Sequence, residues 1–202
     1  MRIRDISFDS VPDRSGTNSL KWAKYEGEDI IPMWVADMDF RSPQCVLDLA
    51  GKICEKGNFG YGICPAGLYE VLISRTNKFY NWPVKKHWIT WLPGMVCGLN
   101  VACRTFENSA KQVITNTPIY PPFLSAPKNF DLTSVRIPMV LENDRFTIDF
   151  NKLNELSTNR GDLFMLCHPH NPVGTNFTRE ELFRLGEYII DRDLFICSDE
   201  IH

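Results

Sequence analysis

The segment LFMLCHPHNPVGTNFTREELFRLGEYIIDRDLFICSDEIH, residues 163–202, predicts a strand, a loop, a helix and a second strand in that order. Leu163–Cys167 and Leu194–Cys197 are short, almost wholly apolar runs, which is typical of strands buried on both faces of a sheet. Between them, Thr178 and Glu181 have the spacing of a capping box at the start of a helix. The apolar side of this helix consists of Leu182, Leu185, Ile189 and Ile190. Strands that alternate with helices indicate an α/β layer with a mostly parallel sheet.

The sequence before residue 163 shows the same alternation of helices and strands. Ser42 and Pro43 predict a helix start, a capping residue followed by a first-turn proline, and Gly57 predicts the end of that helix. Residues 1–41 show little periodicity and are rich in turn-forming residues. Further elements are expected at about Leu68 to Tyr80 (helix), Ile89–Leu92 (short strand), Met95–Phe106 (helix) and Val113–Thr115 (strand).

The composition is that of an ordinary globular protein, with 44% hydrophobic and 23% charged residues in a chain of 202. The net charge of −3 and the lack of a basic run give no electrostatic reason to expect nucleic acid or an anionic membrane surface as a partner. The first ten residues, MRIRDISFDS, are polar and charged and lack the apolar stretch of a secretory signal. No apolar stretch has the length that crosses a bilayer, so the sequence predicts a soluble, cytoplasmic protein.

Cysteine and histidine residues suggest no metal centre or disulfide framework. The seven cysteines are an odd number without a Cys-x-x-Cys pair, and most lie inside apolar segments. We therefore expect mostly buried free thiols rather than disulfides or a catalytic cysteine. His168 and His170 suggest a metal site at first, but they are flanked by prolines and lack Cys, Asp or further His at ligand spacing. Both are expected on the surface of a loop, without a metal.

Three loops with unusual residues follow predicted strands. They are TPIYPPF (residues 117–123), CHPHNPVG (residues 167–174) and SDEIH (residues 198–202). Ligands of such sheets bind beyond the carboxyl ends of the strands, which is where these loops lie. Prolines fix the backbone direction of the loops and reduce the entropy lost on ordering them. Each loop presents one side chain suited to specific binding, and these are Tyr120, Asn171 and Asp199.

Six segments in family order resemble the fold-type-I pyridoxal-phosphate (PLP) enzymes, the aspartate aminotransferase superfamily, and within it the C–S lyases of the MalY/PatB and cystalysin type. They are WVADMDF (34–40), FGYG (59–62), PGMV (93–96), TPIYPPF (117–123), HNPVG (170–174) and SDEIH (198–202). The resemblance implies an α/β fold of the PLP-dependent transferase type, with a mostly parallel sheet. Residues 1–42 are then an N-terminal segment, part of the small domain and of a substrate-side lid. Residues 43–202 are then the PLP-binding large domain, incomplete at its C-terminus.

The resemblance also implies roles for the loop residues. Asp199 would pair with the pyridine nitrogen of PLP and keep it protonated, so that the ring can accept electrons. Asn171 would donate to the 3′ oxygen of the ring, and Tyr120 would stack on its face. His202 lies three residues beyond Asp199, where related enzymes place a Tyr or His near the cofactor.

The phosphate of PLP needs hydrogen-bond donors. The backbone N–H groups of Met95 and Val96, at a helix start, would supply them. Tyr61 resembles the tyrosine that reaches the phosphate of the neighbouring subunit's cofactor, which implies a homodimer. The residues ICPA (63–66) depart from the family pattern at this neighbouring-subunit contact.

The implied activity is that of a C–S β-lyase, which converts cystathionine or another cysteine S-conjugate to pyruvate, ammonia and a thiol. Ala36 and Asp37 resemble the segment that lies over the substrate, and the WVADMDF pattern favours the lyase over an aminotransferase on the same fold. No catalytic residue is assigned, because the Schiff-base lysine of the family lies beyond His202 and no lysine here has a matching context. A truncated, inactive product is the remaining alternative, and the 202 residues alone are expected to be neither stable nor active.

Overall fold

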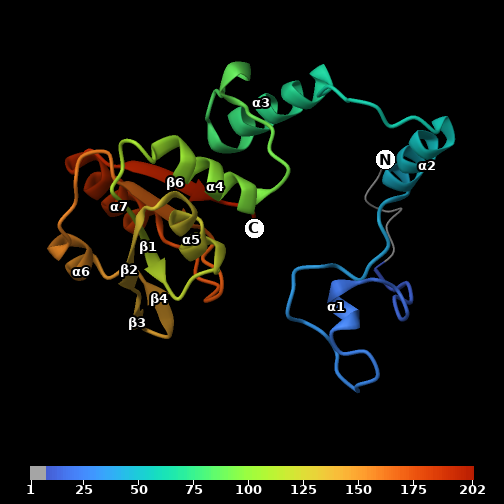
Figure 1. Cartoon of the computed structure of the whole chain (residues 1–202), viewed down its shortest axis with the longest axis horizontal. Helices are drawn as coiled ribbons and strands as arrows, with labels where there is room; N and C mark the ends of the chain where they lie inside the picture. Colours follow the sequence, from blue (N-terminus) through green and yellow to red (C-terminus); the bar gives the residue numbers. More distant parts are fainter. Residues whose placement is uncertain (1–7) are drawn as a thin grey trace. The chain divides into compact units, whose positions relative to one another are not determined.

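The computed structural model describes residues 8–202, so residues 1–7 of the predicted N-terminal segment lie outside the described residues. The chain forms two compact units, Met1–Val84 and Lys85–His202, each with its own helices (Figure 1). The division between residues 42 and 43 concerns the two domains of a complete enzyme, and it stays a prediction.

The first unit contains three helices, α1 (Leu20–Ala23), α2 (Gln44–Lys56) and α3 (Ala66–Tyr80). The prediction that Ser42 caps α2 is wrong, because Pro43 is the N-cap residue and the helix begins at Gln44; it ends at Lys56, with the predicted Gly57 as its C-cap. The φ of Gly57 is 65°, in the left-handed region that glycine adopts without strain. Both predicted helices of this part are therefore confirmed. Neither α2 nor α3 has a buried residue.

The second unit contains a four-stranded sheet in which every pair of neighbours runs parallel, as predicted. The strand order is β2-β1-β5-β6. The strands are β1 (Gln112–Thr117), β2 (Thr133–Pro138), β5 (Leu163–Cys167) and β6 (Phe195–Asp199). β5 has the predicted bounds, while β2 was not predicted.

The second unit also contains helices, several of which are drawn beside the sheet (Figure 1). They are α4 (Met95–Phe106), α5 (Pro122–Ser125), α6 (Phe150–Glu155), α7 (Arg179–Asp191) and the short 3₁₀ helices η2 (Lys86–Trp88) and η3 (Pro127–Phe130). α4 has the predicted bounds. The predicted capping box of α7 is confirmed, since Thr178 accepts from the N–H of Glu181 and the Glu181 side chain accepts from the N–H of Thr178.

Alternate residues of β5 pack into two hydrophobic cores. Leu163, Met165 and Cys167 join the core that contains residues of α4 and α5. Phe164 and Leu166 join the core that contains residues of α6 and α7. All five residues of β5 are buried, as expected of a central strand covered on both faces.

A short antiparallel hairpin, β3 (Val140–Glu142) and β4 (Arg145–Thr147), lies outside the main sheet and was not predicted. Its two-residue turn, Asn143 and Asp144, has φ values of 51° and 60°, the left-handed conformation that tight hairpin turns require. Arg145 connects the hairpin to α7 by a bidentate ion pair with Glu181, with N–O distances of 3.0 and 2.8 Å.

Two strand predictions need correction. Ile89–Leu92 is not a strand, because no strand among residues 8–202 pairs with it and an extended segment becomes a strand only through such hydrogen bonds. The strand near Leu194 is confirmed as β6, but its burial on both faces is wrong. β5 is its only neighbour in the described sheet, and Phe195 and Ile196 are 45% and 48% exposed.

The cysteine prediction is also wrong in part. All seven cysteines are free, but only Cys103 and Cys167 are buried. In the described part of the chain, no helix combines the length and the apolar character needed to cross a membrane.

Candidate functional site

The three predicted loops are connected at the carboxyl edge of the sheet. The backbone N–H of Tyr120 donates to the carbonyl oxygen of Asn171 at 3.0 Å, which joins the loops after β1 and β5. The backbone N–H of His168 donates to the carbonyl oxygen of Asp199 at 2.9 Å, which joins the loop after β5 to the end of β6. The parallel register pairs Cys167 with Asp199 at the same edge. The structure therefore brings Tyr120, Asn171 and Asp199 to one end of the sheet.

His170 joins two of these loops a second time. Its ring Nε2 lies 2.8 Å from the carbonyl oxygen of Pro118, to which the neutral ring donates from that nitrogen. Burial lowers the pKa of His170, although its contacts with the Pro118 and Cys167 carbonyl groups oppose this, so the ring is neutral at pH 7. The side chain is only 1% exposed. The expectation that His170 lies on a loop surface is therefore wrong.

Asp199 is a buried carboxylate at the last position of β6. The residue is 5% exposed, and its Oδ1 accepts a hydrogen bond from the backbone N–H of Ile201 at 3.2 Å. Within residues 8–202 it forms no ion pair. A buried carboxylate is normally paired with a cation, because an uncompensated buried charge is costly. Asp199 is thus suited to accept a hydrogen bond from a cationic N–H group of a ligand.

The thiols beside this carboxylate are poor nucleophiles. The Cys167 sulfur accepts a hydrogen bond from the backbone N–H of Asn171 at 3.4 Å. Burial raises the pKa of Cys167 and of Cys197, and the negative charge of Asp199 raises both further. The Asn171 N–H opposes the shift at Cys167 without reversing it. Both thiols stay protonated at neutral pH and serve as packing groups.

The start of α4 lies at the same edge of the sheet. A helix that packs on a sheet and leads directly into the next strand runs antiparallel to that strand, so the N-terminus of α4 is level with the carboxyl end of β1. Gly94 precedes the helix and provides no side-chain cap. The amides of Met95 and Val96 therefore have no acceptor from a capping side chain, and they can bind an anionic group.

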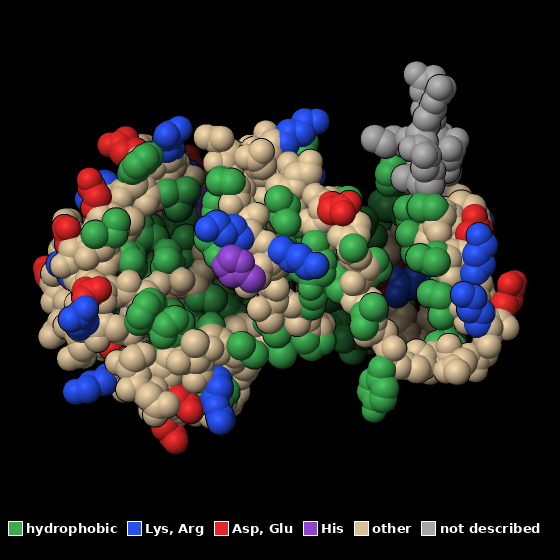
Figure 2. All heavy atoms as spheres, turned by 90° about the horizontal axis from the view of Figure 1, so that it is seen from above, with side chains coloured by type: hydrophobic (Ala, Val, Ile, Leu, Met, Phe, Trp, Pro, Cys, Tyr) green, Lys and Arg blue, Asp and Glu red, His purple; other side chains and the backbone are tan. Residues whose placement is uncertain are grey.

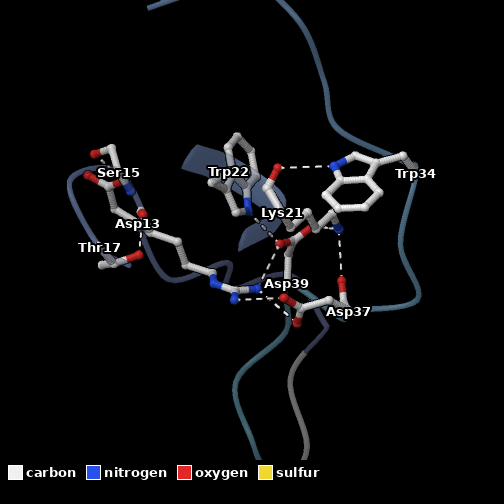
Figure 3. Close-up of polar contacts among 9 residues, drawn as sticks. Asp13, Ser15, Thr17, Lys21, Trp22, Trp34, Asp37 and Asp39 are labelled. Carbon is white, nitrogen blue, oxygen red and sulfur yellow. Dashed lines mark hydrogen bonds and ion pairs between the residues drawn. The ribbon is translucent and has the colours of Figure 1, made fainter. Parts of the chain in front are cut away.

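Ala36, Asp37 and Tyr61 belong to the first compact unit, whereas the three loops belong to the second. Ala36 is exposed and Tyr61 is fully exposed. The carboxylate of Asp37 is held by Arg14 in a bidentate ion pair, one of the contacts drawn in Figure 3. His202, the last residue, is exposed.

Sequence reasoning missed several residues that hold these segments. His170 and Cys167 carry no local signal of their contacts, although His170 directly precedes the predicted Asn171. Arg14 and Lys21 carry no clear signal either, because Lys24 also precedes WVADMDF and the acidic residues Glu26, Glu28 and Asp29 lie nearer to both. Among residues 8–202 there is no cluster of three or more His, Cys, Asp or Glu side chains that could hold a metal ion.

Comparisons with known proteins match nearly the whole chain. A family model described as aminotransferase class I and II matches residues 37–202. Cystathionine beta-lyase PatB of Bacillus subtilis (strain 168) is 34% identical over 203 residues, which is 98% of this chain and 52% of that protein. The chain thus spans about half the length of the curated relatives it matches.

Solved structures agree with the fold. The crystal structure of OvoB superposes with a TM-score of 0.88 at 39% identity, covering 97% of this chain and 52% of that one. Cystalysin from Treponema denticola, whose structure contains pyridoxal 5′-phosphate, gives a TM-score of 0.86 at 29% identity, covering 98% and 52%. The predicted fold class, α/β with a mostly parallel sheet, is therefore confirmed.

Proposed function

Because the chain belongs to the aminotransferase class I and II family, we propose that the full-length protein is a PLP-dependent carbon–sulfur β-lyase. Its substrate is cystathionine or another thioether of cysteine, and its products are pyruvate, ammonia and a thiol. The similarity to PatB, a cystathionine beta-lyase, over nearly the whole chain supports the lyase reaction.

The buried, unpaired carboxylate of Asp199 is the observation that carries this proposal. When bound, PLP supplies a protonated pyridine ring that accepts electrons from the reacting carbon of the substrate. Asp199 fits this group, because its buried carboxylate accepts the ring N–H and keeps that nitrogen protonated. Asn171 donates its side-chain amide to the ring oxygen, and the half-exposed ring of Tyr120 offers a face for stacking.

The remaining cofactor contacts involve the phosphate. The amides of Met95 and Val96 at the start of α4 bind it through hydrogen bonds and the helix dipole. Tyr61 reaches it from a neighbouring subunit, and His202 lies near the cofactor beside Asp199. Ala36 and Asp37 lie over the substrate.

We also propose a homodimer. Helices α2 and α3 have 13 and 15 residues, yet none of these residues is buried, so their apolar side chains are exposed. Figure 2 shows apolar side chains at the surface along the chain. The exposed apolar residues of these helices include Val46, Leu49, Ile53, Leu68, Val71 and Phe79. A second copy would cover them, and Tyr61 lies in the segment between these two helices. Light scattering of the full-length protein tests this, and a monomeric mass at micromolar concentration would contradict it.

The cytoplasm is the proposed compartment. All seven cysteines are free, which suits a reducing environment. Fractionation of cells that express the full-length protein checks this, and recovery outside the cytoplasm would refute it.

The reaction is tested by giving the full-length protein L-cystathionine without any keto acid. Pyruvate, ammonia and free thiol should appear in equal amounts. Asp199→Asn should lower kcat/KM by roughly a hundredfold, the scale of removing one electrostatic stabilising group. The variant should still retain PLP through the phosphate, as measured by cofactor absorbance after gel filtration. Asp191→Asn, at an exposed position of α7, is the matched control and should be fully active.

An aminotransferase is the second candidate, which the name of the matching family model favours. In that case turnover requires a keto acid, and the amino group is recovered on it. Near-normal elimination by Asp199→Asn would show instead that the role given to Asp199 is wrong.

A further inference from the structure

Arg14 and Lys21 bind the segment 34–40 through its two aspartates, and Figure 3 shows Lys21 beside Asp37 and Asp39. The guanidinium of Arg14 donates to both oxygens of Asp37, at 3.0 and 2.8 Å, and reaches Asp39 Oδ1 at 3.4 Å. The Lys21 ammonium donates to Asp39 Oδ2 at 2.7 Å and to the backbone carbonyl oxygen of Asp37 at 2.8 Å. We call these four residues the clamp. It contains two cations and two anions, so its net charge is zero.

Two indole rings extend the clamp. The Nε1–H of Trp22 donates to Asp39 Oδ1 at 2.8 Å, and the Nε1–H of Trp34 donates to the Lys21 carbonyl oxygen at 3.3 Å. The contacts join residues that are 13 to 25 positions apart in the chain. They therefore fix a segment that has no regular secondary structure of its own between α1 and α2.

Lys21 is the buried member of the clamp. The residue is only 7% exposed, whereas lysine is almost never buried unless it is paired. The carboxylate of Asp39 and the carbonyl oxygen of Asp37 compensate the lost hydration of the ammonium. Because one of these acceptors is main chain, Lys21 sets where the backbone of Asp37 lies, and not only where a side chain points.

The clamp also neutralises the charges of the two aspartates. The hydrogen bonds from Arg14 lower the pKa of Asp37, and those from Lys21 and Trp22 lower the pKa of Asp39, so both carboxylates are ionised at pH 7. Their charges are neutralised by the two cations. An amino-acid substrate carries a carboxylate that unpaired aspartates would repel. A neutral clamp removes this repulsion.

We infer that Lys21 is a positioning residue, which holds the backbone of Ala36 and Asp37 in the conformation that receives an amino-acid substrate. This inference rests on the proposed function only for the substrate contact. That Lys21 fixes the segment 34–40 does not depend on the proposed function.

The test compares three variants of the full-length protein. Lys21→Met keeps the length of the side chain but removes its charge and donors, and Lys21→Arg is the conservative variant. Lys128→Met, at an exposed position of η3, is the matched control. The first measurement is hydrogen exchange of the amides of residues 34–40 in the cofactor-free protein. Lys21→Met should exchange at least roughly tenfold faster there, Lys21→Arg should be intermediate, and Lys128→Met should match the wild type.

The second measurement is steady-state elimination by the loaded enzyme. Lys21→Met should raise KM by roughly the factor by which the held conformation is depopulated, with little change in kcat or in PLP affinity. Unchanged exchange in Lys21→Met would overturn the inference. Faster exchange with an unchanged KM would overturn the positioning role.

Asp39→Asn provides a second route if Lys21→Met does not fold. It weakens the same contact from the acceptor side and should also accelerate exchange in residues 34–40. Equal exchange in Asp39→Asn and wild type would contradict the inference. If the wild type itself performs no elimination, the proposed function fails, and the exchange measurement still decides whether Lys21 holds the segment.

Discussion

Asp162 offers a prediction whose magnitude follows from its contacts. Its carboxylate is fully buried and accepts five hydrogen bonds, from the backbone N–H groups of Lys111, Gln112 and Asn159 and from the side-chain amides of Gln112 and Asn159. The N–O distances lie between 2.7 and 3.2 Å. The Asp162 side chain therefore connects the amino end of β1 to the turn before β5, at the edge of the sheet opposite the candidate site.

Asp162→Asn should destabilise the fold by about 3 kcal/mol. The new amide keeps one oxygen for Lys111 and Gln112, but both bonds lose the negative charge that strengthened them. The side-chain amide of Asn159 can rotate to present its oxygen to the new NH₂ group, but the same rotation of Gln112 would break its hydrogen bond to the Ser157 carbonyl oxygen. The backbone N–H of Asn159 cannot do so and loses its acceptor on the Asp162 side chain, which adds to the cost.

The assay is urea unfolding of the full-length, cofactor-free protein, with the midpoint compared between variants. Asp191→Asn, an exposed position, is the control and should change stability by no more than about 0.5 kcal/mol. Burial alone would raise the pKa of Asp162, but the donors from Asn159, Lys111 and Gln112 outweigh it and lower the pKa below 3.8. The carboxylate thus stabilises the fold fully above about pH 5, and this stabilisation is lost as the pH falls below about 4.

The difference between wild type and Asp162→Asn should therefore be constant from pH 6 to 8 and shrink towards pH 3. A variant within about 1 kcal/mol of the wild type at pH 7 would refute the reasoning, since it would mean that the five bonds contribute little. A difference that stays constant down to pH 3 would refute the lowered pKa.

Two further predictions concern stability and thiol reactivity. Thr178→Ala removes the cap of α7 and should cost about 1 kcal/mol in urea unfolding, while Thr105→Ala on the exposed side of α4 should cost less; equal costs would contradict the capping role. Burial, with the nearby Cys197 thiol, raises the pKa of Cys103 to about 11, so this thiol should react with iodoacetamide at pH 8 far more slowly than the exposed Cys45. Mass spectrometry of labelled peptides measures both rates, and similar rates would show that Cys103 is accessible.

Elements with a strong local pattern were predictable from the sequence. The bounds of α4 and β5 and the capping box at Thr178 follow from residues that lie within a few positions of one another. The edge at which Tyr120, Asn171 and Asp199 meet was also predictable, because carboxyl ends of parallel strands coincide. The roles of these residues stay predictions.

Features that depend on distant contacts were not predictable. Ile89–Leu92 has the composition of a strand, but composition does not provide a neighbour to pair with. The prolines around His170 suggested a surface loop, yet its ring contacts the carbonyl of a residue 52 positions away. The role of Asp162 was not predicted, because three of its five bonds come from Lys111 and Gln112, 50 or 51 positions away in the chain.

The two-sided packing of β5 limits how this protein can change in evolution. Successive residues of the strand enter opposite cores, so each position accepts a different apolar residue of similar size. A deletion of one residue within the strand is not tolerated in this way, because it shifts the alternation of side chains and turns Met165 and Leu166 toward the opposite cores. The deletion would also displace the Cys167 sulfur, which accepts a hydrogen bond from the backbone N–H of Asn171. Natural relatives should therefore exchange apolar residues of similar size within this strand, while insertions and deletions should occur in the loops at the opposite edge of the sheet.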